Sequence, residues 1–350
     1  MSVALATYNG GWYLGKQLES LASQTLKPRE LVVCDDGSTD DTVAILKAFA
    51  SRAAFPVRVH VNDVNLGSTK NFEQAIQRCQ GDFIALCDQD DVWRPHKLER
   101  VVAAFGASPD LDAVFSDGEV VDEDLRPLGY GLWDAAGFGA VRRQRMAQGR
   151  ALEVLLKNDV VTGATLVFRR AFRDTIVPIP EVWVHDAWIA LVIVALGGKL
   201  GAIDDPLILY RKHRRQQVGV VSRSDDGALA WVWSSLGDVR RDVDGYVATG
   251  DELYALFAER YQAAGERLAA LGDRVDPRAV AGCRAKVAHF RARIAMTAHP
   301  WLRFPLVLGE LARLRYFRYS SGAKSLARDL VRAAMFWTPP GHRSPRVSVW

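Results

Sequence analysis

Five short apolar runs alternate with stretches of helical periodicity over about the first 120 residues of this 350-residue chain. The alternation predicts βαβ units and therefore the α/β fold class, in which helices cover both faces of a mostly parallel sheet. The apolar runs are residues 2–7, 30–37, 57–62, 82–88 and 111–117, and the helical stretches between them are 12–24, 40–50, 69–79 and 96–105.

The pattern changes twice farther along the chain. It weakens over 118–150, where we expect a long loop above the edge of the sheet. It then resumes, and predicts a helix over 147–157, a strand over 164–168 and helices over 170–177 and 185–197. After about residue 220 only helical periodicity remains. We therefore expect an α/β domain over 1–220 and a helical, basic region over 221–350.

Charge is divided unevenly between these parts. Residues 281–350 hold 13 Lys and Arg against two acids, a net charge of +11, whereas residues 1–280 carry −7. The apolar and aromatic residues interleaved with the bases include Trp301, Phe304, Leu306 and Tyr316. Either this region is a helical domain with a solvated basic face, or it is an interfacial surface for anionic lipid. No nucleic-acid-binding module is recognisable, so we expect no nucleic-acid partner.

Three features favour a cytoplasmic protein. The N-terminus "MSVALATYNGG" has no basic segment of the kind that opens a signal peptide. The four cysteines show no metal-ligand spacing and are typical of buried thiols in a reducing compartment. The longest uncharged apolar run, 187–198, is too short to span a bilayer. Any membrane contact is therefore expected to be peripheral, on the inner face of the cytoplasmic membrane.

Polar residues follow four of the predicted strands at their carboxyl ends. In open α/β sheets, ligands bind in the crevice beyond these ends. The polar groups are Thr7 to Asn9, Asp35 and Asp36, Asn62 and Asp63, and Asp88 to Asp91. The sequence therefore predicts a ligand site at this edge of the sheet.

The densest of these groups is "DQDD" at 88–91. Asp88 and Asp90 are spaced so that both can reach one hard cation, Mg²⁺ or Mn²⁺. Because Mg²⁺ usually takes only one or two protein carboxylates and completes its shell with water and phosphate, this pair implies a phosphate-bearing ligand. Asp91 is explained equally well as a cap of the helix that starts near Pro95.

Three other positions each allow two interpretations. Asp36, in a turn that follows a buried strand, can accept a hydrogen bond from a nucleobase. Asp186, at the start of an apolar helix, is either an N-cap or a general base. Arg211 and His213 follow an apolar strand, and they belong either to a solvated basic loop or to a site that neutralises a diphosphate, with His213 as a metal ligand.

The absent motifs exclude several classes of enzyme. The chain has no GxGxxG after its first strand, no GxxxxGK[ST] and no GxSxG. Dehydrogenase, P-loop nucleotidase and α/β-hydrolase functions therefore lose their main support.

Six segments, taken in order, resemble the inverting family 2 glycosyltransferases with the GT-A fold, and "DQDDVW", "HDAW" and "LYRKH" are most similar to the bacterial rhamnosyltransferase branch. The segments are "ATYNG" (6–10), "VVCDDGSTDDT" (32–42), "NLGSTKNFEQAI" (65–76), "GDFIALCDQDDVWRPHKLE" (81–99), "KNDVVTGATLVFRR" (157–170) and "HDAWIAL" (185–191). The resemblance covers about residues 2–218.

The resemblance implies a role for each matching residue. Asp186 corresponds to the catalytic base, although many members carry Glu-Asp where this chain has His185-Asp186. Asp90 corresponds to the metal-binding aspartate of the DxD motif, with Asp88 near the ribose and metal and His213 near the metal or diphosphate. The residues that it places around the nucleotide sugar are Thr7, Asn9, Asp36, Lys70, Asn71, Asp88 and Arg211.

The implied reaction moves one sugar from a nucleotide diphosphate, with dTDP-rhamnose favoured, to a saccharide acceptor carried on a polyprenyl diphosphate in surface polysaccharide synthesis. Its cofactor would be Mg²⁺ or Mn²⁺, and the Gln-x-x-Arg-Trp signature of processive synthases is absent. Two other functions stay open. One is a sugar-1-phosphate nucleotidyltransferase, although "ATYNGGWYLGK" fits its glycine-rich basic loop poorly. The other is a catalytically silent, sugar-nucleotide-binding subunit of an assembly complex.

Overall fold

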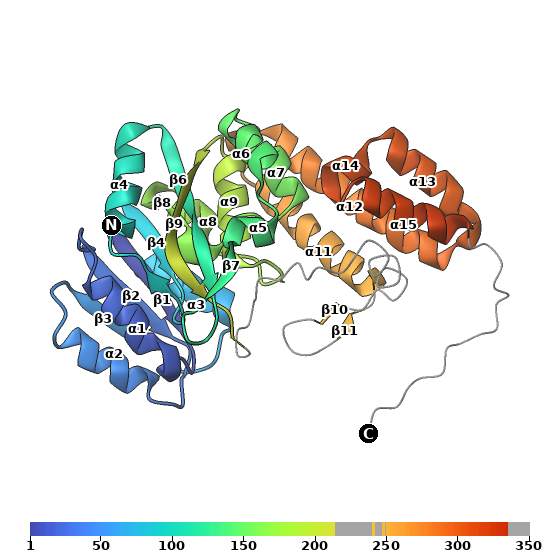
Figure 1. Ribbon diagram of the computed structural model, residues 1–350. Coiled ribbons are helices and arrows are strands. Elements are labelled where there is room, and N and C mark those ends of the chain that lie inside the picture. The colour runs from blue at the N-terminus through green and yellow to red at the C-terminus, as the bar shows by residue number, and fades with distance from the viewer. Residues whose placement is uncertain (214–239, 242–246, 249, 335–350) are drawn as a thin grey trace, which may run out of the picture.

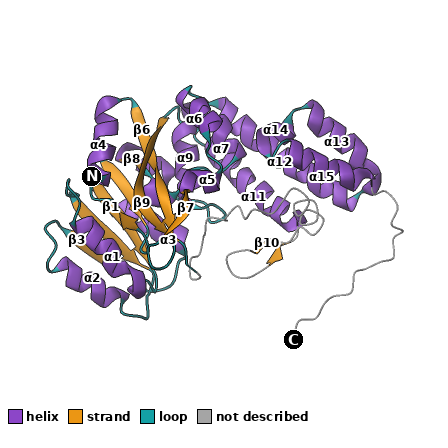
Figure 2. Cartoon of the chain, viewed as in Figure 1, coloured by secondary structure: helices purple, strands orange, loops and turns teal. Residues whose placement is uncertain are grey.

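A nine-stranded sheet lies between two layers of helices, and a group of helices extends from one side of it (Figures 1 and 2). The structure is a computed structural model that describes residues 1–213, 240–241, 247–248 and 250–334. The α/β class predicted from the sequence is confirmed.

The first part of the chain alternates strands and helices as predicted. Its elements are β1 (Ser2–Thr7), α1 (Gly11–Ala22), β2 (Glu30–Asp35), α2 (Thr42–Ala50), β3 (Val57–Val61), α3 (Ser68–Arg78), β4 (Phe83–Cys87), β5 (Val92–Trp93) and α4 (Lys97–Ala107). Next come β6 (Leu111–Val121), β7 (Pro127–Gly131), α5 (Leu132–Ala136), α6 (Ala140–Ala147), α7 (Ala151–Lys157), η1 (Gly163–Thr165), β8 (Val167–Arg169), η2 (Arg170–Phe172), α8 (Arg173–Ile176), α9 (His185–Ala195) and β9 (Lys199–Arg211).

The strand order is β3-β2-β1-β4-β8-β6-β9-β5, with β7 paired to β6. Strands β1 to β4 pair in parallel, β8 runs antiparallel to both β4 and β6, and β9 is parallel to β6. The carboxyl ends of β1, β2, β4, β6 and β9 therefore lie along one edge. Because β8 runs the other way, the residues just before it reach the same edge.

Alternation along the strands separates two apolar cores. Val3 and Leu5 face the core shared with α1, α2 and α4, whereas Ala4 between them faces the core shared with α3 and α9. All three residues are fully buried. Strands buried on both faces are near-continuous apolar runs, which explains why the sequence located them.

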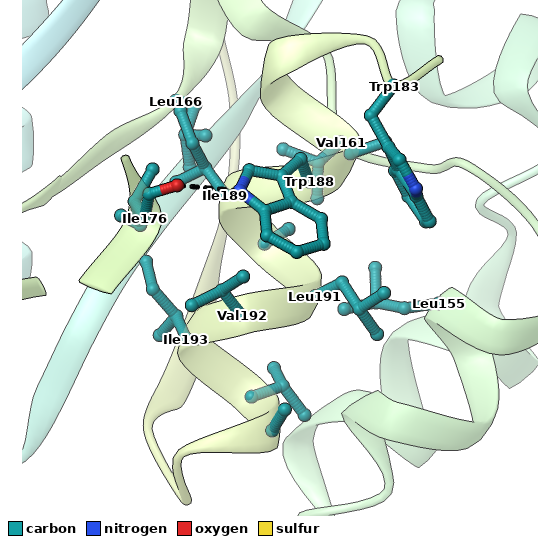
Figure 3. Close-up of a cluster of buried hydrophobic side chains, with 14 of the residues drawn as sticks. Leu155, Val161, Leu166, Ile176, Trp183, Trp188, Ile189, Leu191, Val192 and Ile193 are labelled. Carbon is teal, nitrogen blue, oxygen red and sulfur yellow. Dashed lines mark hydrogen bonds between the residues drawn. The ribbon is translucent and has the colours of Figure 1, made fainter. Parts of the chain in front are cut away.

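Helix α9 is the centre of the second core. Ten of its residues are buried, which makes it apolar all round, as expected for a helix with neighbours on every side. Leu155 of α7 lies beside its Leu191, and the Trp188 indole donates to the Ile176 carbonyl at 2.8 Å (Figure 3).

The remaining described elements are β10 (Arg240–Arg241), β11 (Val247–Ala248), α11 (Gly250–Ala269), η3 (Gly272–Arg274), α12 (Pro277–Ala298), η4 (Pro300–Leu302), α13 (Arg303–Ala312), α14 (Arg315–Tyr319) and α15 (Ala323–Ala334). Tyr261 of α11 and Cys283 of α12 belong to the same core as α9. The boundary predicted near residue 220 lies outside the described residues. Among the helices the structure describes, none is both long and apolar enough to cross a membrane.

Two expectations were wrong. The segment 118–150 is not a long loop, because β6 continues to Val121, pairs with β7, and is followed by α5 and α6. The sequence hid these elements, since β7 is rich in glycine and α6 buries only Met146. Strands also occur after residue 220, because β10 pairs antiparallel with β11. Strands of two residues are too short to show periodicity.

Candidate active site

The carboxyl ends of β1 and β2 are joined by a hydrogen-bond network around Asp35. This carboxylate is fully buried and accepts from the Thr7 hydroxyl at 2.8 Å, the Ser38 amide at 2.9 Å and the Ser38 hydroxyl at 2.6 Å. Asn9 adopts a left-handed conformation with φ 46° and accepts from the Thr39 amide at 2.9 Å. Thr7 and Asn9 therefore hold two loops together at the predicted edge.

Asp36 holds the loop that follows β3. Its carboxylate accepts from the amides of Leu66 at 2.9 Å and Gly67 at 2.8 Å, and from the Asn62 side chain at 2.8 Å. Asn62 also donates to the Asn71 side-chain oxygen at 3.0 Å. The structure thus brings Asp36 and Asn71 into one network, in which Asp36 is 2% exposed.

The predicted polar pair Lys70 and Asn71 divides between two surroundings. Asn71 donates to the backbone carbonyls of Thr7 and Cys34, so it ties α3 to the ends of β1 and β2. Lys70 instead donates to the Ile179 carbonyl at 2.7 Å and pairs with Glu73 at 3.0 Å. Lys70 therefore anchors the segment that leads into α9.

The end of β9 meets the predicted carboxylates. The His213 Nε2 atom lies 2.8 Å from Asp90 Oδ2, and the Arg211 Nε atom donates to the Asp90 carbonyl at 2.7 Å. The backbone amide of Arg211 donates to Asp91 Oδ1 at 3.0 Å. The Tyr13 ring packs on His213 with ring centroids 4.4 Å apart. Residues more than 120 positions apart in the chain therefore share one small volume.

Negative charge is concentrated at this point. Burial, together with the nearby carboxylates of Asp90 and Asp186, raises the pKa of Asp88 to about 8. Burial also raises the pKa of Asp91 well above its usual range, with added repulsion from Asp90 and Asp88. A cation near Asp88 and Asp90 would relieve this repulsion.

Asp90 and His213 are suitable donors for a divalent cation. A carboxylate and an imidazole in contact offer two ligands to Mg²⁺ or Mn²⁺, and Asp88 adds charge nearby. Within residues 1–213 and the other described ranges, no three His, Cys, Asp or Glu side chains form a group that could hold a metal. Asp90 and His213 would supply two ligands and leave the rest of the shell of an ion to water or phosphate.

Asp186 lies in the first turn of α9 and contacts the residues that lead into β8. Its Oδ2 atom accepts from the Gly163 amide at 2.8 Å, and its Oδ1 atom accepts from the Ala187 amide at 2.6 Å. His185 is 5% exposed and stacks on Phe72 with ring centroids 4.0 Å apart. Neither of its ring nitrogens has a hydrogen-bond partner among the described residues.

Gly163 lies too close to His185 and Asp186 to carry a side chain without a shift of its neighbours. A Cβ atom there would lie 2.8 Å from His185 Nε2 and 3.4 Å from Asp186 Oδ2. No side chain fits without moving the first turn of α9. Gly163 is therefore a positioning residue for Asp186 that the sequence did not reveal, because one glycine before a strand looks like an ordinary loop residue.

Two further residues of this edge were missed. Lys97 is fully buried, donates to the Ala164 carbonyl at 2.6 Å and lies 3.5 Å from the centre of the Trp93 ring. Burial lowers its pKa to about 7, although Cys87, Asp91 and Asp88 oppose this effect. Gln89 accepts from the Tyr8 amide at 2.9 Å and donates to the Tyr8 carbonyl at 3.0 Å. Both residues lie within the "DQDDVWRPHKLE" motif, which was the available signal.

The comparisons with known proteins agree with this architecture. A Mycobacterium tuberculosis protein is 27% identical over 215 residues, which are 61% of this chain and 59% of the relative. An uncharacterized glycosyltransferase of Nostoc is 27% identical over 220 residues, 61% of this chain and 65% of its own length. The aligned part thus spans about three fifths of the first relative's length.

A solved structure supports the fold. The crystal structure of Staphylococcus aureus TarS 1–349 in complex with UDP-GlcNAc matches with a TM-score of 0.55 and 17% identity, over 95% of this chain and 90% of that one. Residues 2–175 match the family described as Glycosyl transferase family 2. The chain therefore carries a glycosyl transferase family 2 domain, and its α/β architecture is that of the GT-A fold.

Proposed function

We propose that this protein is an inverting glycosyltransferase that uses a nucleotide diphosphate sugar. One observation carries the proposal: Asp186 lies close enough to Asp88 to raise its pKa, at the sheet edge where Asp90 meets His213. A candidate base and a candidate diphosphate site thus lie at the same edge of the sheet. The TarS structure is a complex with UDP-GlcNAc, which supports a sugar nucleotide as donor.

Each residue of this edge receives a role in the proposal. Asp36 would accept from the nucleobase, and Thr7, Asn9 and Asn71 would shape the nucleotide site through the network described above. Arg211 would counter the charge of the diphosphate. Lys70 fits a nucleotide contact less directly, since it donates to the Ile179 carbonyl.

Asp90 and His213 would hold Mg²⁺ or Mn²⁺, with Asp88 beside them. When bound, the ion would neutralise charge that develops on the departing nucleoside diphosphate. The proposed base, Asp186, would take the proton of the acceptor hydroxyl while that oxygen attacks the anomeric carbon from the face opposite the diphosphate. The Gly163 amide would hold the carboxylate in line.

The substrates are proposed more specifically from the sequence resemblance. We favour dTDP-rhamnose as donor and a polyprenyl-diphosphate-linked saccharide as acceptor, in surface polysaccharide synthesis at the inner face of the cytoplasmic membrane. In this proposal, residues 1–220 form the catalytic domain and 221–350 a separate basic C-terminal region. A nucleotidyltransferase has no comparable structural support.

One observation favours the silent, donor-binding subunit. Both carboxylate oxygens of Asp186 accept from protein amides, as they would in a purely structural helix cap. Turnover separates the two functions, because a cap needs only to bind amides whereas a base must transfer a proton.

The test begins with calorimetric titration of dTDP-rhamnose, UDP-sugars and GDP-sugars, with and without Mn²⁺. We expect one donor to bind, and we expect Asp90→Asn to reduce the increase in donor affinity that Mn²⁺ produces. Asp186→Asn should keep that donor affinity and lose about 10³-fold or more in transfer. Asp82→Asn, at the opposite end of β4 and 89% exposed, is the matched control. Near-normal transfer by Asp186→Asn would remove Asp186 from the mechanism.

A further inference from the structure

The outer face of the last helices is apolar. Trp301 of η4 is 67% exposed, and Phe304 and Leu308 of α13 are 44% and 59% exposed. Their spacing of three and then four residues places them on one side of a continuous helical segment. We call these three residues the outer stripe. The inner side of α13 is buried at Val307, which packs with Met296 and Tyr316. Helix α13 is thus apolar on its inner and outer faces.

The acids of this region are turned inward. Residues 281–334 contain only Glu310 and Asp329 as acids, and these are 4% and 2% exposed. Glu310 pairs with His289 at 2.7 Å and with Arg315 at 2.8 Å. Asp329 pairs with Arg293 at 2.9 Å. No carboxylate of these residues is therefore left on the surface.

The exposed charges of the same residues are consequently all positive. The bases with exposed side chains are Arg284, Arg291, Arg313, Arg318 and Lys324. Further apolar side chains lie among them, because Leu314 and Phe317 are 50% and 44% exposed. Helices α13, α14 and α15 lie at the end of the molecule farthest from β3 (Figure 1).

We propose that the outer stripe and the surrounding bases form a docking surface for an anionic lipid bilayer. Trp301, Phe304 and Leu308 would enter the headgroup region, and the guanidinium and ammonium groups would bind lipid phosphates. The proposed contact is interfacial, and no described helix is both long and apolar enough to cross a bilayer. This proposal rests on the proposed function only for the purpose of the docking surface, which is to bring the protein to a lipid-linked acceptor.

A lipid bilayer fits the surface better than the other polyanions do. Nucleic acid would bind the bases, but it gives no reason for an exposed Leu308 beside Trp301. An acidic protein partner could bury both kinds of side chain. A protein partner would require a surface of complementary shape, whereas a bilayer requires only the outer stripe and the positive charge.

The test is vesicle co-sedimentation of the full chain at low salt. We expect binding to vesicles that contain phosphatidylglycerol. The partition coefficient should be at least about tenfold lower for pure phosphatidylcholine vesicles, and also in high salt. The triple variant Trp301→Ser, Phe304→Ser, Leu308→Ser should lose about tenfold or more in the partition coefficient. Its control replaces three exposed valines outside this region by serine, at Val64, Val102 and Val141. The control should bind as the unmodified chain does.

Unchanged binding of the stripe variant, or equal binding of the unmodified chain to neutral vesicles, would overturn the proposal. So would loss of binding only when Arg313, Arg318 and Lys324 are changed to Gln, since that result describes a general polyanion site. Quenching by brominated lipid provides a second readout, because Trp301→Phe should remove part of the quenching and leave the binding intact. Donor binding should be normal in every variant, which separates this failure from failure of the proposed function.

Discussion

Lys286 gives a prediction about stability whose size follows from its surroundings. It lies on α12, is 4% exposed, and donates from Nζ to the Leu156 carbonyl of α7 at 2.7 Å. The ring of Tyr261 is 3.8 Å from the same nitrogen. Burial, with a smaller contribution from Arg260 and against the opposing effect of Asp159, lowers the pKa of Lys286 from 10.5 to about 7. Each pKa unit is about 1.4 kcal/mol, so the buried charge costs about 5 kcal/mol.

The sign of the pH dependence follows from proton binding. Between pH 7 and 10.5 the unfolded chain binds the proton at Lys286 and the folded chain does not, so stability rises with pH in this window. Below pH 7 both states carry the charge and the full cost is present. Above pH 10.5 both are neutral and the cost disappears.

We therefore expect Lys286→Met to be more stable than the unmodified chain at pH 7. The advantage should be about 4 kcal/mol, because loss of the amine–carbonyl hydrogen bond offsets about 1 kcal/mol of the stability gained by removing the buried charge. It should shrink by about 1.4 kcal/mol per pH unit towards pH 10.

Urea unfolding of both chains at pH 7, 8, 9 and 10 measures this difference, provided that unfolding is reversible. Lys47→Met, at an exposed lysine of α2, is the matched control for the loss of an ammonium group. A free-energy difference that stayed constant across these pH values would refute the reasoning, since Lys286 would then not change its protonation on folding.

Two other substitutions probe the site and the C-terminal helices. Gly163→Ala should lower kcat about tenfold or more and leave donor affinity unchanged. The new Cβ would lie 2.8 Å from His185 and displace the turn that holds Asp186. The control in the transfer assay is Gly15→Ala on α1, where a Cβ would meet nothing within 4 Å. Asp329→Asn should lower the free energy of unfolding in urea by about 3–5 kcal/mol, because it leaves the buried Arg293 without its bidentate carboxylate. A decrease below about 1 kcal/mol would show that the pair is exposed to water in solution.

The sequence predicted the buried strands β1, β2 and β4 and the partly buried β3, and it missed β7, which is mostly exposed. Val3, Ala4 and Leu5 are apolar in succession because both sides of β1 are covered. The strand β7 has exposed residues at Pro127, Leu128 and Gly129, so no apolar signal marks it. Helix α6 was missed for a similar reason, since only Met146 of its eight residues is buried.

The site was predictable where it depends on the ends of strands and not where it depends on later packing. The positions of Thr7 and Asp36 follow from the direction of parallel strands. The meeting of His213 with Asp90 depends on the path of β9. The residues alone allowed it as one of two interpretations, and the resemblance to a family then favoured it. Lys97 was missed because a single lysine at the start of a helix is usually solvated, whereas here its ammonium group is buried against Trp93.

The position of α9 affects how far this protein can be recombined with its relatives. Ahead of this helix, which bears Asp186, Trp183 donates from its indole to the Arg260 carbonyl of α11, and its ring packs against that of Tyr261. The helical region therefore forms one wall of the core that supports the proposed base. A chimera that exchanged residues 250–334 alone would pair α9 with a foreign surface. Modular exchange would succeed only if Trp183 and the buried face of α9 moved with it.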